Sequence, residues 1–190
     1  MEFQKVENFE LCFDFDACGA NIRLLFDKTI LSFVADDSGS EPLSTLLEST
    51  VYLEDAIVLE DYECVWRNMR DSEIMKIQII KDEENVRLSF DLYKFDEFQE
   101  INTLYNSWKF ELSYLLYRKN IVTTCLRMLK RYGIRGFNDK WTPDMPTDCF
   151  SINTLLAAMG HKITVSDGEL KSDIFEELKI LMQNIEGLNE

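Results

Sequence analysis

Residues 108–133 read WKFELSYLLYRKNIVTTCLRMLKRYG and contain the change of hydrophobic period that decides the fold. Up to Tyr114, apolar residues occupy every second position, which is typical of a strand with one buried face. From Ile121 they recur at three- and four-residue spacing, which is typical of an amphipathic helix. Gly133 follows at a position where a helix can end in the left-handed conformation. The stretch therefore predicts a strand that leads into a helix over residues 118–132.

The same two periods divide the chain into a strand-rich part, residues 1–115, and a helix-rich part, residues 116–190. Only one helix, which opens at Pro42, is expected before the change of period. The expected strands are 9–16, 22–26, 30–34, 64–69, 74–80, 86–92 and 108–114, and the expected helices are 42–53, 118–132, 148–159 and 172–186. We therefore expect a single α+β domain, 1–190, with an antiparallel sheet of about six or seven strands and helices packed on one face.

The charge of the chain is strongly negative and unevenly distributed. Its 190 residues include 20 Lys and Arg against 35 Asp and Glu, a net charge of −15. Residues 1–100 carry 9 basic and 24 acidic side chains, whereas residues 101–190 carry 11 of each. Because such a surface repels phosphate backbones and anionic lipids, we expect neither nucleic acid nor membrane as a partner. The alternative is that the charge serves only solubility.

The cysteines point to a reducing compartment. There are five, Cys12, Cys18, Cys64, Cys125 and Cys149, an odd number without a C-x-x-C pair, so neither a disulfide framework nor a zinc site is expected. The first ten residues contain three glutamates and no apolar run, and no stretch approaches the ~20 apolar residues of a membrane span. These features predict a cytoplasmic protein with reduced thiols.

Catalytic groups are scarce. His161 is the only histidine, and its place after Gly160 favours a solvated or capping side chain over a nucleophile and base pair with Cys149. Asp14 and Asp16 lie on one strand face, as an acid and base pair or a cation site requires, but so do the acids of any exposed strand. No phosphate-binding or metalloprotease motif is present. We expect no enzyme, cofactor or metal, and the rival is a hydrolase that uses Asp14, Asp16 and a divalent cation.

The densest acidic run surrounds the apolar residues 56–59. Carboxylates beside an apolar ridge attract cations and accept charge-assisted hydrogen bonds from arginine, although a solvated loop has the same composition. The expected contacts to a basic protein partner are Glu54, Asp55, Glu60, Asp61 and Glu63, together with Asp14 and Asp16.

One succession of features resembles a known group of proteins. A hairpin ends in the polar Asp36-Asp37 loop, Ser40-Glu41-Pro42-Leu43-x-x-Leu46-Leu47 opens a helix, and Trp66-Arg67 lies on the next strand. Over residues 9–92 this resembles uncharacterised compact bacterial proteins, some of which are similar to immunity proteins of contact-dependent and other polymorphic toxin systems. The resemblance implies a cytoplasmic binding protein without a cofactor. Because the net negative charge lies in residues 1–100, we expect such a module to neutralise a basic toxin domain. The alternative is a structural or homo-oligomeric protein, such as a homodimer.

Overall fold

The computed structural model describes residues 2–16, 19–35, 42–53, 61–68, 73–96 and 101–141, together with 155, 158–159, 165–166 and 169–170. The chain divides into two compact units, Met1–Ile121 and Val122–Glu190. Each unit is described by itself below. The expectation of a single domain stays a prediction.

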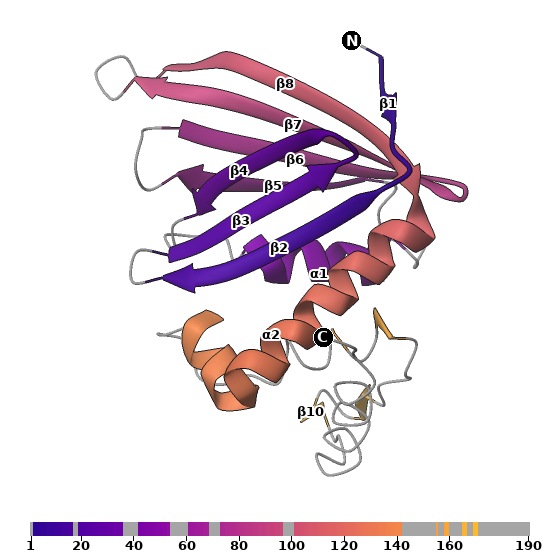
Figure 1. The fold of residues 1–190 in the computed structure, drawn as a ribbon, viewed down its shortest axis with the longest axis vertical. Helices are drawn as coiled ribbons and strands as arrows, with labels where there is room; N and C mark the ends of the chain where they lie inside the picture. Colours follow the sequence, from indigo (N-terminus) through magenta and orange to yellow (C-terminus); the bar gives the residue numbers. More distant parts are fainter. Residues whose placement is uncertain are drawn as a thin grey trace. The chain divides into compact units, whose positions relative to one another are not determined.

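The first unit is built on an antiparallel sheet whose strands follow the order β1-β8-β7-β6-β5-β4-β3-β2 (Figure 1). Every pairing is antiparallel except that of β1 with β8. One helix, α1 (Pro42–Tyr52), connects β4 to β5, and a second, α2 (Tyr114–Trp141), follows β8. The strands are β1 (Gln4–Lys5), β2 (Phe9–Asp16), β3 (Gly19–Phe26), β4 (Thr29–Ala35), β5 (Asp61–Asn68), β6 (Glu73–Asp82), β7 (Asn85–Asp96) and β8 (Ile101–Ser113).

The mixed α+β character is confirmed, but the expectation of one continuous sheet of six or seven strands is wrong. Strands β2–β4 form a block of three and β5–β8 a block of four. Among the described residues, the pair that joins the two blocks is Ala35 with Asn68, at the edge of the described parts of both strands. The cause is the connection between β4 and β5, which includes α1 rather than the short turn that would hold two strands in register along their length.

One face of the sheet, the inner face, carries the hydrophobic core. The pairs Phe9 with Phe26 and Leu11 with Leu24 place apolar side chains side by side on the three-strand block. Because strand side chains alternate, every second residue is buried. The buried apolar residues of the sheet are Phe9, Leu11, Phe13, Ile22, Leu24, Phe26, Leu31, Met75, Ile77, Ile79, Val86, Leu88, Phe90, Phe110 and Leu112.

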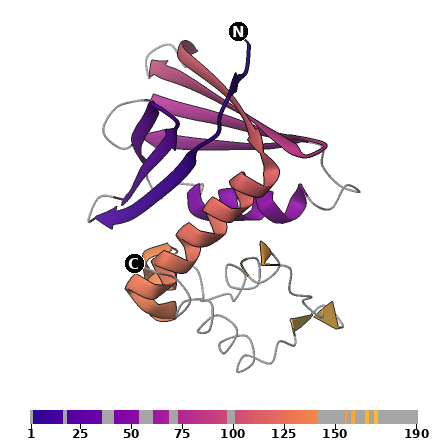
Figure 2. The same cartoon turned by 45° about the vertical axis from the view of Figure 1, so that its right-hand side comes forward.

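Aromatic rings join the two strand blocks across this core. The ring centroids of Phe26 on β3 and Phe110 on β8 lie 3.9 Å apart with an interplanar angle of 6°. Phe90 on β7 meets Phe26 edge to face at 5.6 Å. Since β3 and β8 stand far apart in the strand order, the sheet must curl until their inner faces meet. Figure 2 shows this curvature from a second direction.

The N-terminal segment connects the two ends of the curled sheet. β1 pairs with β8, and the Val6 N–H donates to the Glu111 carbonyl at 2.8 Å. Three residues later the chain enters β2, beside the two-residue turn between β3 and β4. There the Asp27 N–H donates to the Asn8 carbonyl at 2.9 Å. Residues 4–9 therefore run from one end of the strand order to the other.

The Asp27 carboxylate fixes this connection. It accepts hydrogen bonds from the Asn8 backbone N–H at 2.9 Å, the Asn8 side-chain amide at 3.2 Å and the Glu7 N–H at 3.4 Å. These bonds, the Asn8 backbone bond above all, lower the pKa of Asp27 below its ordinary value of 3.8. Its φ of 49° lies in the left-handed region, which aspartate tolerates better than most residues.

The helices of the first unit lie on the inner face, as expected (Figures 1 and 2). On α1, Leu46 and Leu47 are buried, and the fully buried Ser49 hydroxyl donates to the Leu46 carbonyl at 2.7 Å. The same hydroxyl lies 2.6 Å from that of Tyr117 on α2, whose ring stacks on Phe9 at 6.1 Å. Buried hydroxyl pairs and aromatic stacking thus hold both helices against the sheet.

Helix α2 begins four residues before the expected 118. The Leu116 N–H donates to the Ser113 hydroxyl at 3.2 Å, so Ser113 acts as an N-cap. The helix continues through Gly133 to Trp141, and the expected stop at Gly133 is wrong. A glycine inside a helix costs about 1 kcal/mol relative to alanine, which weakens the helix but does not end it, and no proline occurs within residues 114–142.

Strands β7 and β8 are longer than the sequence indicates. Residues 94–107 were expected to be a connection, but β7 continues to Asp96 and β8 starts at Ile101. The register shifts between Leu92, which pairs with Asn106, and Tyr93, which pairs with Leu104. Tyr105 is the extra residue of a β-bulge, and this extra residue breaks the alternation that reveals a strand in the sequence.

The second unit contains the rest of α2 and an antiparallel pair, β9 (Val165–Ser166) with β10 (Glu169–Leu170). Within the expected helix 148–159, Leu155 and Ala158 are helical and buried, and the Met159 N–H donates to the Leu155 carbonyl at 3.0 Å. The other residues of that helix and all of the expected helix 172–186 lie outside the described residues.

Replacing Tyr117 with phenylalanine should destabilise the first unit. Because the Ser49 hydroxyl donates to Leu46, Tyr117 is the donor in the buried pair, and its loss removes one hydrogen bond worth about 1 kcal/mol. Urea denaturation should show a lower midpoint with an unchanged m-value. Leu115→Ala, at a side chain that is 74% exposed, is the control and should change the unfolding free energy by less than about 0.5 kcal/mol. An unaltered midpoint for Tyr117→Phe would contradict the assigned role of the pair.

Asp27→Asn should change how stability depends on acid. The folded-state pKa of Asp27 is lowered, so its contribution is present above the ordinary value of 3.8 and is lost as the pH falls through the folded pKa. The wild type should therefore exceed the variant in melting temperature at pH 6, and the gap should close below about pH 3. Ser32→Ala, a neutral exposed change on β4, should leave the pH profile unaltered. A gap that persists at low pH would show that the charge of Asp27 is not responsible.

Candidate functional site

The outer face of the sheet, opposite the core, is the surface on which the described strands gather polar side chains. Cross-strand pairs fall on it together, such as Cys12 with Arg23 and Lys76 with Asp91. None of its charged members is buried. The described members of the outer face used below are Glu10, Cys12, Asp14, Arg23, Lys76, Gln78, Arg87, Asp91, Lys109 and Glu111.

The β2 end of the outer face is acidic. Glu10 and Asp14 are exposed four residues apart on this strand, and Glu7 is exposed two residues before it. We call these three residues the acidic row. Lys5 is the only base between residues 2 and 16. Glu7 leads directly into β2, at the end of the strand order, so the row presents its carboxylates along this one strand.

A cysteine lies within the acidic row. The Cys12 thiol donates to the Glu10 carboxylate at 3.5 Å, and the Arg23 guanidinium donates to the Cys12 sulfur at 3.8 Å. The Cys12 side chain is half-buried, whereas those of Glu10 and Arg23 are exposed. Arg23 therefore extends across from β3 toward β2, where its guanidinium reaches the sulfur that lies beside Glu10.

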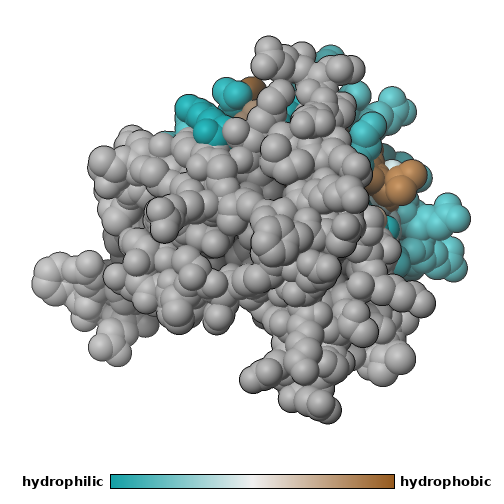
Figure 3. Space-filling view, turned by 90° about the horizontal axis from the view of Figure 1, so that it is seen from below, coloured by the Kyte–Doolittle hydropathy of each residue, from teal (hydrophilic) through white to brown (hydrophobic). Residues whose placement is uncertain are grey.

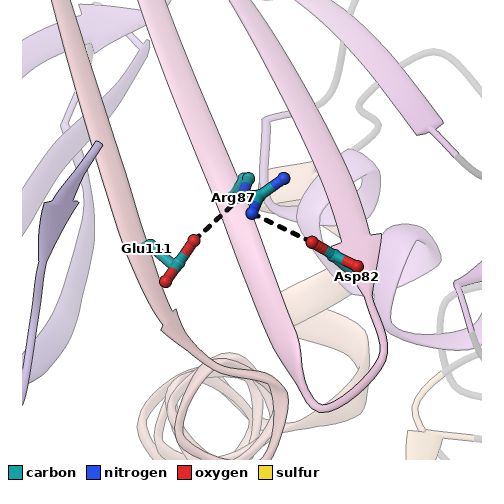
Figure 4. Close-up of polar contacts among 3 residues, drawn as sticks. All are labelled: Asp82, Arg87 and Glu111. Atoms are coloured by element: carbon teal, nitrogen blue, oxygen red, sulfur yellow. Dashed lines mark hydrogen bonds and ion pairs between the residues drawn. The ribbon is translucent and has the colours of Figure 1, made fainter. Parts of the chain in front are cut away.

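The β7–β8 end of the outer face is organised around Arg87 (Figure 4). Its Nε donates to Glu111 Oε2 at 2.9 Å across the strand pair, and its Nη2 lies 3.0 Å from Asp82 Oδ2. The hydrogen bond that Arg87 donates to Glu111 and the negative charge of Asp82 raise the pKa of Arg87 above its ordinary value. Since the side chain of Arg87 is 40% exposed, this cluster contributes little stability and chiefly fixes the orientation of three side chains.

Cations over aromatic rings make the β6–β8 part of the outer face different from β2. Lys76 lies 5.2 Å from the ring centroid of Tyr93, and Lys109 lies 5.7 Å from that of Phe3. Arg87 also approaches the Phe3 ring, at 5.6 Å. Strand β2 carries three acids and no base, while β6–β8 carry both signs, with their cations placed over aromatic rings.

The expected partner residues fall into three groups. Asp14 is exposed in the acidic row and pairs with Asn21, and Asp16 follows it on β2, paired with Gly19. Asp61 and Glu63 lie on β5, paired with Ile80 and Gln78 of β6. Glu54, Asp55 and Glu60 lie outside the described residues.

The strand register does not bring the described members into one patch. Asp14 pairs with Asn21 of β3, which in turn pairs with Val34 of β4. Val34 precedes Ala35, whose pair with Asn68 connects the two blocks. Glu63 is five residues from Asn68, which at about 3.3 Å per residue is roughly 16 Å along β5. The sequence prediction combined the acids of β2 and β5 in one partner surface, but the register places them in two separate groups.

The residues of the catalytic and metal-site hypotheses are described only in part. Cys149 and His161 lie outside them, so that pair stays untested. Among the described residues, no group of three His, Cys, Asp or Glu could hold a metal ion. The Cys125 thiol on α2 is fully buried, and desolvation raises its pKa, which keeps it protonated.

Sequence reasoning missed Arg87 and Phe3 as members of the outer face. Arg87 and Glu111 each alternate with apolar residues on their own strands, so a period-two pattern indicates that both face outward. Their pairing needs the β7–β8 register, which the pattern does not contain. Phe3 precedes a two-residue strand that no periodicity reveals.

Viewed from below in Figure 3, hydrophobic residues of the described surface stand in small separate groups among hydrophilic ones. In the described part of the chain, no helix is long and apolar enough to cross a membrane. No family model, curated protein or solved structure matches this sequence.

Proposed function

We propose that this protein is a non-catalytic binding module that recognises a basic protein partner through its acidic N-terminal strand. The acidic row carries the proposal, because it places exposed carboxylates in a line on β2 with a single base, Lys5, beside them. Such a line attracts a positively charged surface during association and suppresses binding of acidic proteins.

The kind of partner follows from the same charge. A toxin domain that acts on nucleic acid must expose lysine and arginine to bind phosphates, and an inhibitor of opposite sign that covers this surface blocks access to the substrate. An immunity protein in the cytoplasm of the toxin-producing cell is the role that we favour. The net charge of −15 in residues 1–100 supports this role, since 24 acidic side chains there outnumber 9 basic ones.

The structure refines which acids to test first. Glu10 and Asp14 are exposed on one face of a regular strand, where four residues at about 3.3 Å each separate them by roughly 13 Å. Guanidinium groups on a partner can bind such carboxylates with bidentate geometry. The acids of β5 and of the 54–60 stretch belong to a second, separate test.

Binding to the product of the gene beside this one should depend on salt and on Glu10. We expect the complex to weaken between ~50 and ~500 mM NaCl, because exposed charges are screened over about 10 Å at 0.1 M salt. At ~50 mM, Glu10→Gln should reduce the affinity a few-fold and Glu10→Lys about tenfold, mainly through the association rate, as measured by surface plasmon resonance.

Leu115→Lys is the matched control for Glu10→Gln, because both raise the net charge by one unit at an exposed position. It should leave the affinity within about twofold. A complex that is indifferent to salt and to Glu10→Lys would remove the acidic row from the mechanism. If Glu60→Lys with Asp61→Lys abolished binding while Glu10→Lys did not, the partner surface would be the 54–63 run instead.

A further inference from the structure

Strand β8 exposes a segment that the proposed partner surface does not use. β8 pairs with β7 along its length, but on its other side β1 covers only Phe110 and Glu111. Residues 103–106 are all exposed, with Leu104 at 52% and Tyr105 at 63%. Large apolar side chains at such exposure in a soluble protein suggest an interaction surface when they are contiguous.

The bulge decides what kind of contact this segment can make. Tyr105 is the extra residue, and next to it the Ser107 N–H donates to the Asn106 side chain at 2.8 Å. That N–H is already occupied by the side chain of its own strand. A long continuous ladder with an added strand is therefore disfavoured, since bulges and occupied donors protect an edge. Side chains, rather than backbone pairing, must supply the contact.

The charge of the segment indicates its partner. Residues 101–108 read INTLYNSW and contain no ionisable group except the tyrosine hydroxyl, although the whole chain carries −15. A basic partner finds no carboxylate here. A second copy of this strongly acidic chain, in contrast, can approach only where like charges do not meet. The strand at the other end of the sheet, β2, carries the acidic row and lacks this property.

We propose that two copies of the protein associate through residues 103–106 of β8, around a two-fold axis that brings Leu104 and Tyr105 of both chains together. In such an isologous contact the same patch serves both subunits, so a segment without carboxylates lets two acidic chains meet without repulsion between acids. The exposed Lys94, whose ammonium lies 4.5 Å from the Tyr105 ring centroid, belongs to the polar rim. This inference rests on residues other than the acidic row, so its failure leaves the proposed function standing.

Sedimentation velocity of the full chain from ~1 to ~200 µM, with reductant at ~150 mM NaCl, tests the proposal. At high concentration the mass should approach twice the chain mass of 22.3 kDa. Leu104→Lys and Tyr105→Lys should each raise the dimer dissociation constant at least about tenfold, because each places two ammonium groups beside the axis. Far-UV circular dichroism checks that both variants fold; since both side chains are mainly exposed, one loss of fold would leave the other variant to decide.

Ile30→Lys is the matched control, because Ile30 on β4 is 60% exposed and the substitution adds the same charge away from β8. It should leave the dissociation constant within about twofold. A monomer at every concentration would overturn the proposal. So would a dimer that resists both β8 substitutions, or one that Ile30→Lys weakens equally.

Discussion

The stacking of Phe26 on Phe110 is the interaction on which the rest of the first unit depends. Hydrogen bonds hold each strand block together, and within the described residues the pair of Ala35 with Asn68 is the backbone pairing between the blocks. The two rings, 3.9 Å apart and nearly parallel, join β3 to β8 through the core instead. An aromatic pair adds about 0.5–1.5 kcal/mol beyond the burial of its area, and burial of two phenylalanines supplies several times more.

The curl that this contact imposes determines where the two proposed partner surfaces lie. With the inner face closed around aromatic rings and two helices, the outer face and the two ends of the strand order remain for partners. The N-terminal segment runs between those ends, tied by Val6 to β8 and by Asn8 to the Asp27 turn. The acidic row lies on this segment and on β2, so its alignment follows from the closure of the sheet.

Strong periodicity made parts of the fold predictable. Val86 to Leu92 alternates without interruption and forms the middle of β7, and the stripe that begins at Ile121 lies in α2. The curl was not predictable, because it depends on which rings meet across the core. The bulge at Tyr105 hid the first half of β8, and the Ser113 cap needed a known strand end to be recognised. Alternation predicted that Asp14 faces outward on its strand, while the separation of the acids of β2 from those of β5 required the strand register.

Native-state amide hydrogen exchange on Phe110→Leu tests the central claim most directly, namely that the aromatic stack unites the two strand blocks. If it does, protection of the core amides should fall by a similar factor in β2–β4 and in β5–β8, because both blocks open in one cooperative event. Loss of protection confined to β7 and β8, with β2–β4 unchanged, would contradict the account and show that each block is stable by itself.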